Sequence, residues 1–174
     1  QDQQQLLKGY LDKLPVNLDQ LDAEHLLHQA PVTNPQQQML MKLLMRLWTP
    51  CYITGKLELL SLVSIELAQQ TLAHGHTEET PFAYLGFAFV YGRLKEDYCL
   101  AYQFGKAGIE LAEQSQNLTI KARAAFLYGL VISNWQNPMT VSLDWLKRSF
   151  TLANEAGDLV YAGYATFYLM SYGF

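Results

Sequence analysis

The sequence predicts an all-α fold in which three to four antiparallel helical hairpins stack into a superhelix. The first observation is a repeat, because residues 149–167 (SFTLANEAGDLVYAGYATF) resemble residues 108–126 (GIELAEQSQNLTIKARAAF) at an offset of 41. An offset of 39, which places Leu72 on Leu111, extends the repeat toward the N-terminus. The second observation is that apolar residues recur at helical spacing, without long period-two alternation. A lone helix pair cannot bury its apolar face in water, whereas stacked copies bury one another.

Residues 1–34 are expected to form short N-terminal helices, because Pro15, Pro31 and Pro35 interrupt the helical pattern. Degenerate helical repeats follow from residue 35 to residue 174. Their approximate boundaries are 35–76, 77–116, 117–157 and an incomplete unit at 158–174.

The first repeat begins with the strongly helical segment QQQMLMKLLMRLW, which we expect to stop at Pro50. Its partner helix, KLELLSLVSIELAQQTLAHG, is expected to end at Gly75. The first segment carries a broad apolar face made of Met39, Leu40, Leu43, Leu44 and Leu47.

Each later repeat also reads as two helices. Pro81 opens the first helix of the second repeat, and Asn117 is the expected N-cap of the next repeat. Gly157 and Asp158 are expected to end one helix and to cap the last one.

Small and large residues recur at fixed repeat positions and are expected to pack in the core. Gly108 and Ser149 should let neighbouring helices approach closely, as should the column of Ala83, Ala122 and Gly163. A column of phenylalanines is expected to fill equivalent buried positions; its members are Phe87, Phe126 and Phe167.

The segment EDYCLAYQFGKAGIEL resembles the turn and second helix of a tetratricopeptide repeat, so we expect a TPR-like superhelix. Three longer segments resemble the helical-repeat part of bacterial signalling kinases: LLMRLWTPCYITGKLELLSLVSIELAQQTLAHG, FAYLGFAFVYGRLKEDYCLAYQFGKAGIELAE and GDLVYAGYATFY. Those proteins combine a serine/threonine-kinase-like domain, a STAND-type AAA ATPase, a GAF domain and a histidine-kinase core. The resemblance implies a regulatory, non-catalytic module whose partners are proteins or neighbouring domains of a longer chain.

Composition excludes several classes of function. The chain has 174 residues, of which half are hydrophobic and 16% are charged, so it is globular. Its net charge is −4 and its Lys and Arg residues are scattered, so no nucleic-acid partner is expected. The longest apolar run, Ala124–Ile132, is too short to span a membrane. Two cysteines make no disulfide framework, so we expect a cytoplasmic location and buried structural thiols.

Catalytic and metal sites are not expected. The sequence contains no Walker A motif, no kinase motif and no G-x-S-x-G elbow, so the segment itself is predicted not to be an enzyme and to need no cofactor. His74 and His76, with Glu78 and Glu79, are the sharpest candidate metal ligands. Their place at a helix C-terminus favours a structural role instead, because histidine there suits the helix dipole.

The eleven tyrosines offer the best candidate binding groups. Several fall on first helices, which line the concave side of a right-handed stack, where aromatic groups can hold a peptide or a small molecule. The candidate groove residues are Tyr84, Tyr91, Arg123, Tyr128, Tyr164 and Tyr168. Half-buried packing is the alternative role for each tyrosine. Two functions stay open: a protein-interaction scaffold, and a sensor that binds a small-molecule inducer in a Tyr-lined groove.

The last segment, LVYAGYATFYLMSYGF, is apolar nearly all round, which suits a helix covered on both sides. We expect either that more helix follows in a longer chain or that the segment forms a homo-oligomer through this helix. The residues expected at that contact are Tyr161, Tyr164, Tyr168 and Tyr172.

Overall fold

The structure, a computed structural model, describes residues 7, 9–12 and 23–172. Within these residues the regular elements are helices, and the loops that carry Pro31 and His76 form one isolated parallel bridge. The all-α prediction is therefore confirmed. Of the N-terminal segment 1–34, in which short helices are expected, residues 1–6, 8 and 13–22 lie outside the described residues. In chain order the helices are α2 (Ala23–Leu27), α3 (Pro35–Ile53), α4 (Leu57–His74), α5 (Thr80–Lys95), α6 (Tyr98–Gln114), α7 (Leu118–Leu127), the π-helical turn η2 (Tyr128–Ile132), the 3-10 turn η3 (Ser133–Trp135), α8 (Met139–Ala156) and α9 (Leu159–Ser171).

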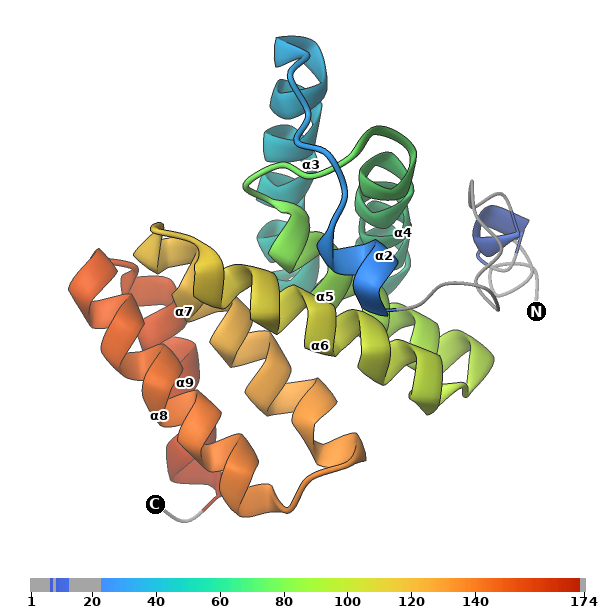
Figure 1. The fold of residues 1–174 in the computed structure, drawn as a ribbon. Coiled ribbons are helices and arrows are strands. Elements are labelled where there is room, and N and C mark those ends of the chain that lie inside the picture. The colour runs from blue at the N-terminus through green and yellow to red at the C-terminus, as the bar shows by residue number, and fades with distance from the viewer. Residues whose placement is uncertain (1–6, 8, 13–22, 173–174) are drawn as a thin grey trace.

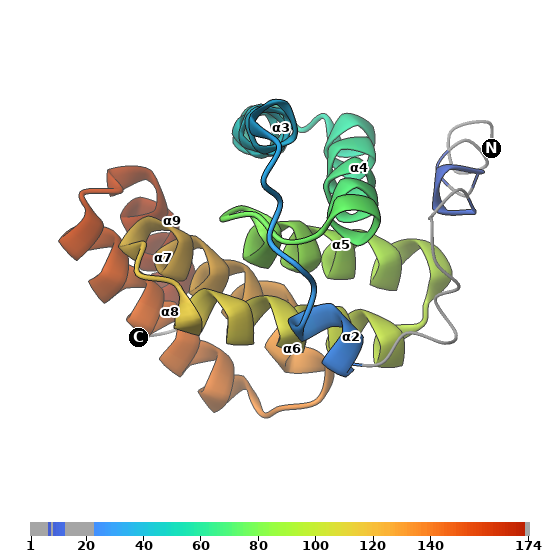
Figure 2. The same cartoon turned by 45° about the horizontal axis from the view of Figure 1, so that its top comes forward.

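Consecutive helices form antiparallel pairs: α3 with α4, α5 with α6, and α7 with α8 (Figure 1). In the first pair, Trp48 Nε1 donates to Ser64 Oγ at 2.9 Å and Gln37 Nε2 donates to Gln70 Oε1 at 2.6 Å. The axes of α3 and α4 run across those of α5 and α6, and α4 packs directly on α5 (Figure 2). Helix α9 packs on α8 and also contacts α7.

Helix starts follow the capping residues. The Asn117 side chain accepts a hydrogen bond from Thr119 N at 3.0 Å, which confirms it as the N-cap of α7. Asp97 and Asp158 cap α6 and α9 in the same way, and Gly157 ends α8 with a φ of 72°. These side chains satisfy backbone N–H groups that have no partner inside their helix.

Helix α3 does not stop at Pro50, so the predicted end was wrong. The helix continues to Ile53, and the Pro50 carbonyl accepts from Thr54 N at 3.0 Å and from Thr54 Oγ1 at 2.7 Å. Proline costs one helical hydrogen bond there, but Trp48 and Cys51 on either side of it are buried and hold the last turn in place.

The repeat relates the α5–α6 pair to the α7–α8 pair through contacts at equivalent places. A Cβ atom on Gly108 would lie 2.8 Å from Pro81 O, so α6 approaches α5 very closely at this glycine. At the position 41 residues later, the buried Ser149 Oγ donates to Ala122 O at 2.8 Å. The close approach that the sequence predicted at Gly108 and Ser149 is therefore present in both pairs.

Aromatic contacts within the two pairs correct the predicted alignment of their first helices, α5 and α7. Phe87 packs on Phe104 with ring centroids 4.7 Å apart, and Tyr128 packs on Trp145 at 5.2 Å. Both members of the second pair lie 41 residues beyond those of the first. Tyr128 is therefore the counterpart of Phe87, and the predicted match of Phe87 with Phe126 is wrong by two residues.

The phenylalanine and small-residue columns break down in α9. Phe87 and Phe126 are buried, but Phe167 is 64% exposed, so its predicted burial was wrong. Gly163 is also exposed, and a Cβ atom there would meet no heavy atom of the described residues within 4 Å. The buried residues of α9 are Tyr161, Ala162 and Ala165, and this helix packs on α8 and α7, whereas its opposite side is not covered by any described residue.

Candidate functional site

Three of the six predicted groove residues are buried in the core, so they do not line an open groove in this structure. Tyr84 is fully buried, with its ring 5.5 Å from that of Phe104, and burial raises the pKa of its hydroxyl. Tyr91 packs against Phe87 at 5.4 Å. Tyr128 is buried as well. These tyrosines are packing residues, which is the alternative role that the sequence allowed.

Tyr164 and Tyr168 do come together, in a cluster that joins α9 to α3. The hydroxyl of Tyr168 lies 3.0 Å from that of Tyr52, and the Tyr164 ring lies 6.0 Å from the Tyr52 ring. Phe126 of α7 contacts both α9 rings at 5.8 Å. We call this cluster the aromatic junction; it consists of Trp48, Tyr52, Phe126, Tyr161, Tyr164 and Tyr168.

Arg123, the remaining predicted groove residue, is engaged in holding α7 against α9. Its Nε donates to Asp158 Oδ2 at 2.8 Å, and its guanidinium carbon lies 5.0 Å from the centre of the Tyr161 ring. Asp158 Oδ1 accepts from Tyr161 N at 3.3 Å, so one carboxylate both pairs with Arg123 and caps α9. Burial raises the pKa of Tyr161 to about 12. The Arg123 side chain is therefore engaged within the fold by Asp158 and Tyr161.

The aromatic junction encloses an apolar cavity of about 20 Å³. Ligand pockets for small molecules usually measure about 300–1,000 Å³, whereas one water needs only about 10–15 Å³. Leu130 and Val131 of the π-helical turn η2 line the cavity beside Thr49. The junction is therefore a packed contact between helices.

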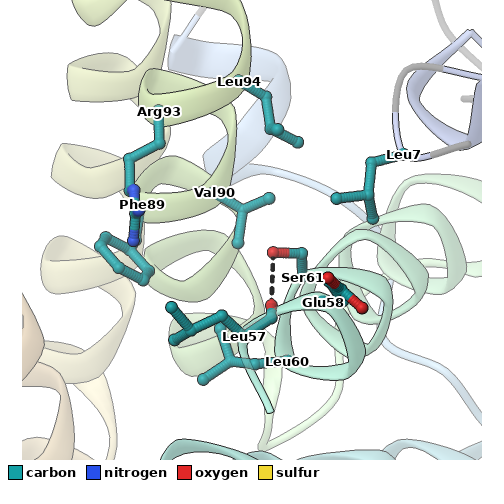
Figure 3. A pocket seen from close by; sticks show the side chains of 9 residues that line it. All are labelled: Leu7, Leu57, Glu58, Leu60, Ser61, Phe89, Val90, Arg93 and Leu94. Carbon is teal, nitrogen blue, oxygen red and sulfur yellow. Dashed lines mark hydrogen bonds between the residues drawn. The ribbon is translucent and has the colours of Figure 1, made fainter. Parts of the chain in front are cut away.

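A larger cavity, of about 170 Å³, lies between α4 and α5 (Figure 3). Leu7 points into it from the N-terminal segment, opposite Val90 and Leu94 of α5. Arg93 lies over the Phe89 ring at 5.4 Å, and Glu58 lies at the rim on α4. Apolar side chains line this cavity together with Ser61 and one charge of each sign, and the cavity is smaller than a usual ligand pocket.

The loop that carries His76 forms one wall of an open cleft of about 430 Å³ beside α3. His76 Nε2 lies 2.9 Å from Leu26 O, and burial lowers the pKa of this imidazole. Burial also raises the pKa of Glu79. Among the described residues no three His, Cys, Asp or Glu side chains are grouped so that they could hold one metal ion.

The two cysteines differ from each other: Cys51 is buried, whereas Cys99 is exposed, contrary to expectation.

Two helices carry exposed apolar side chains in rows. The α3 stripe consists of Met39, Leu40, Leu43, Leu47 and Ile53, which are 37–63% exposed. The α9 stripe consists of Leu159, Val160, Phe167 and Met170, which are 51–76% exposed. Both rows lie opposite the buried side of their helix.

The α3 stripe coincides largely with the apolar face found in the sequence, whereas the α9 stripe differs from the contact predicted there. The apolar face assigned to α3 is the exposed one, because the buried residues are Met41, Met45, Trp48 and Cys51. On α9, Tyr161 is buried, and both Tyr164 and Tyr168 face the aromatic junction. Of the four tyrosines predicted at a self-association contact, Tyr172 alone is exposed. Helix periodicity located the apolar residues of both helices, but it did not tell which side is covered.

No helix within the described ranges is long and apolar enough to cross a membrane. The comparisons with known proteins give no relative: no family model, no curated protein and no solved structure matches this chain.

Proposed function

We propose that this chain is a non-catalytic helical-repeat module that binds other proteins, or neighbouring domains of a longer chain, and thereby regulates a cytoplasmic bacterial signalling kinase. The observation that carries the proposal is the α3 stripe. Met39, Leu43 and Leu47 are each at least half exposed along one side of a well-packed helix. Contiguous exposed apolar patches on a folded protein often mark interaction sites, whereas single exposed apolar residues are common and need no explanation.

The α9 stripe supports the same function at the other end of the helical array. Phe167 and Met170 are 64% and 69% exposed. Burying a side chain of this size contributes roughly 1.5–3 kcal/mol, so a few of them are enough for a useful contact. A partner, further helices of a longer chain, or a second copy would each cover them. The stacking of helix pairs seen here is compatible with a TPR-like superhelix, whose role is to present such surfaces.

The alternative function is a sensor for a small-molecule inducer, which would control an adjacent ATPase. One observation favours the sensor: the cavity in the aromatic junction is apolar and is lined by tyrosines and by Thr49. Its volume of about 20 Å³ requires α9 to move away from α3 before an inducer could enter. The exposed stripes need no such movement, so the interaction module is the better-supported proposal.

Site-specific photo-crosslinking in the cells that express the protein tests the proposal. A photoreactive amino acid is placed at Leu43 or Phe167, and at the exposed Glu155 of α8 as the matched control. Discrete protein adducts at the first two positions, absent at the control position, are expected. Absence of adducts at every position, together with a small molecule that raises the melting temperature of the purified chain, would favour the sensor instead.

A further inference from the structure

We infer that the α3 stripe binds an amphipathic helix that carries acidic residues along one edge of its apolar face. The inference rests on the proposed function and names the class of partner for one of its surfaces. It is carried by the arrangement of apolar and basic side chains on α3.

The two faces of α3 have different roles, although both are apolar. Met41, Met45 and Trp48 point into the core. On the opposite side, Met39, Leu43 and Leu47 are 56%, 53% and 50% exposed. Their spacing of four residues places them in one row, and Ile53, almost four turns after Met39, lies near the line of Met39 at the end of the helix. At 1.5 Å per residue the row is roughly 20 Å long, which matches about four turns of a partner helix.

Basic side chains border this row on one edge. Lys42 and Arg46 are exposed and follow Met39 by three and seven residues, which places them beside the row. Helix α3 contains no acidic residue. Among the described residues no carboxylate lies within ion-pairing distance of Arg46, while Lys42 also faces the cleft that holds Glu79. Because the whole chain has a net charge of −4, this positive edge is a local reversal of charge.

A second copy of the chain does not fit this surface. A contact between two α3 stripes supplies no acidic side chain, because α3 contains none, so Lys42 and Arg46 of both copies stay without a charge partner and an antiparallel contact brings them together. The α9 stripe supplies no acid, because Leu159–Ser171 contains no Asp or Glu. An anionic lipid surface would be attracted by two basic groups but repelled by the remaining charge of the chain. A helix with an acidic edge matches both the apolar row and the basic border.

Two designed helical peptides test the inference on the full chain. Both present the same leucine face; one carries Glu and the other Lys along the edge, and both carry a fluorescent label. By fluorescence anisotropy we expect the Glu peptide to bind about five- to tenfold more tightly than the Lys peptide, because two exposed charge pairs separate them. High salt should reduce the difference.

Variants of the chain locate the binding site. The double variant K42E/R46E should reverse the preference for the Glu peptide, and L43Q/L47Q should weaken both peptides. The matched control K106E/K147E makes the same change of net charge on α6 and α8 and should keep the wild-type preference. Thermal melting of each variant shows that it is folded.

Three results would overturn the inference: equal binding of both peptides, binding to phosphatidylserine vesicles that R46E abolishes, or a dimer in sedimentation that L43Q/L47Q dissolves. Failure of the proposed function can be told apart from these results, because in that case no crosslinking position gives protein adducts. Adducts from Phe167 without adducts from Leu43 would leave the proposed function standing and remove the α3 site.

Discussion

The hydroxyl groups of Tyr52 and Tyr168 lie 3.0 Å apart and join α3 to α9, although 116 residues separate them in the chain. The two rings belong to the aromatic junction, where Phe126 of α7 packs against Tyr164 and Tyr168 of α9. Burial is the main cause that raises the pKa of Tyr52, and the hydrogen bond to Tyr168 raises it further. The first and last long helices of the described array are thus fixed to each other.

Removing either hydroxyl of this pair should cost stability. Tyr52→Phe and Tyr168→Phe are each expected to lower the free energy of unfolding by about 0.5–1.5 kcal/mol, the usual net worth of one hydrogen bond. The double variant should cost less than the sum of the two, because the second change removes no further bond. Tyr98→Phe, at a 47% exposed tyrosine, is the matched control and should change stability by under about 0.5 kcal/mol. Urea unfolding measures all four; strictly additive effects of the two junction changes would contradict the bond.

Alkaline pH should unfold the protein through its buried tyrosines. The pKa of Tyr161 is raised to about 12 in the folded state, against about 10 in an unfolded chain. The unfolded state therefore loses its proton first. The stabilising contribution is fully present below about pH 10 and is lost as the pH rises toward 12, by on the order of 2 kcal/mol. Urea unfolding between pH 8 and 12 measures the loss, and Tyr161→Phe should reduce its slope. A slope that this variant leaves unchanged would contradict the assignment to Tyr161.

Two glycines in helices should respond to alanine in opposite directions. In Gly108→Ala the new Cβ would lie 2.8 Å from Pro81 O and 2.9 Å from Leu85 Cγ. Because a backbone carbonyl cannot move aside alone, we expect a loss of about 1–3 kcal/mol. In Gly163→Ala the methyl group meets no described atom within 4 Å, and alanine should stabilise α9 by about 0.5–1 kcal/mol. Thermal and urea unfolding measure both; a destabilising Gly163→Ala would show that α9 is covered in solution.

Two phenylalanines that the repeat alignment treated alike should behave differently. Phe126 is 3% exposed and contacts three tyrosine rings of α9, so Phe126→Ala should cost about 3–5 kcal/mol. Phe167 is 64% exposed, and Phe167→Ala should change the free energy of unfolding by less than about 0.5 kcal/mol. Urea unfolding at low protein concentration measures the pair. Equal large losses would mean that α9 packs on its exposed side as well.

The candidate site was harder to predict than the fold. The sequence indicated tyrosines as binding groups, but burial of Tyr84 and Tyr128 depends on the helices that lie above them. Tyr52 was missed because its partner Tyr168 is 116 residues away, and no local pattern links them. The exposed row on α3 was visible in the sequence as an apolar face, yet Met41 and Met45 offer a second apolar face of similar size. A period of 3.6 residues finds both faces and cannot choose between them.

The sequence by itself determined the features that depend on neighbours in the chain. Asn117 and Asp158 start their helices because their side chains accept the free backbone N–H groups of the first turn. Gly108 and Ser149 marked the close approach of paired helices because small side chains alone allow it. The all-α class followed from helical spacing sustained along the whole repeat region.

Tertiary structure alone decided the features that depend on what covers each helix. It made Tyr128, and not Phe126, the counterpart of Phe87, because α5 is buried on most sides and its apolar pattern therefore matches at either offset. It left Phe167 exposed, because nothing within the described chain covers that side of α9. Burial is a property of the neighbours that three-dimensional packing supplies, and one helix's sequence does not contain them.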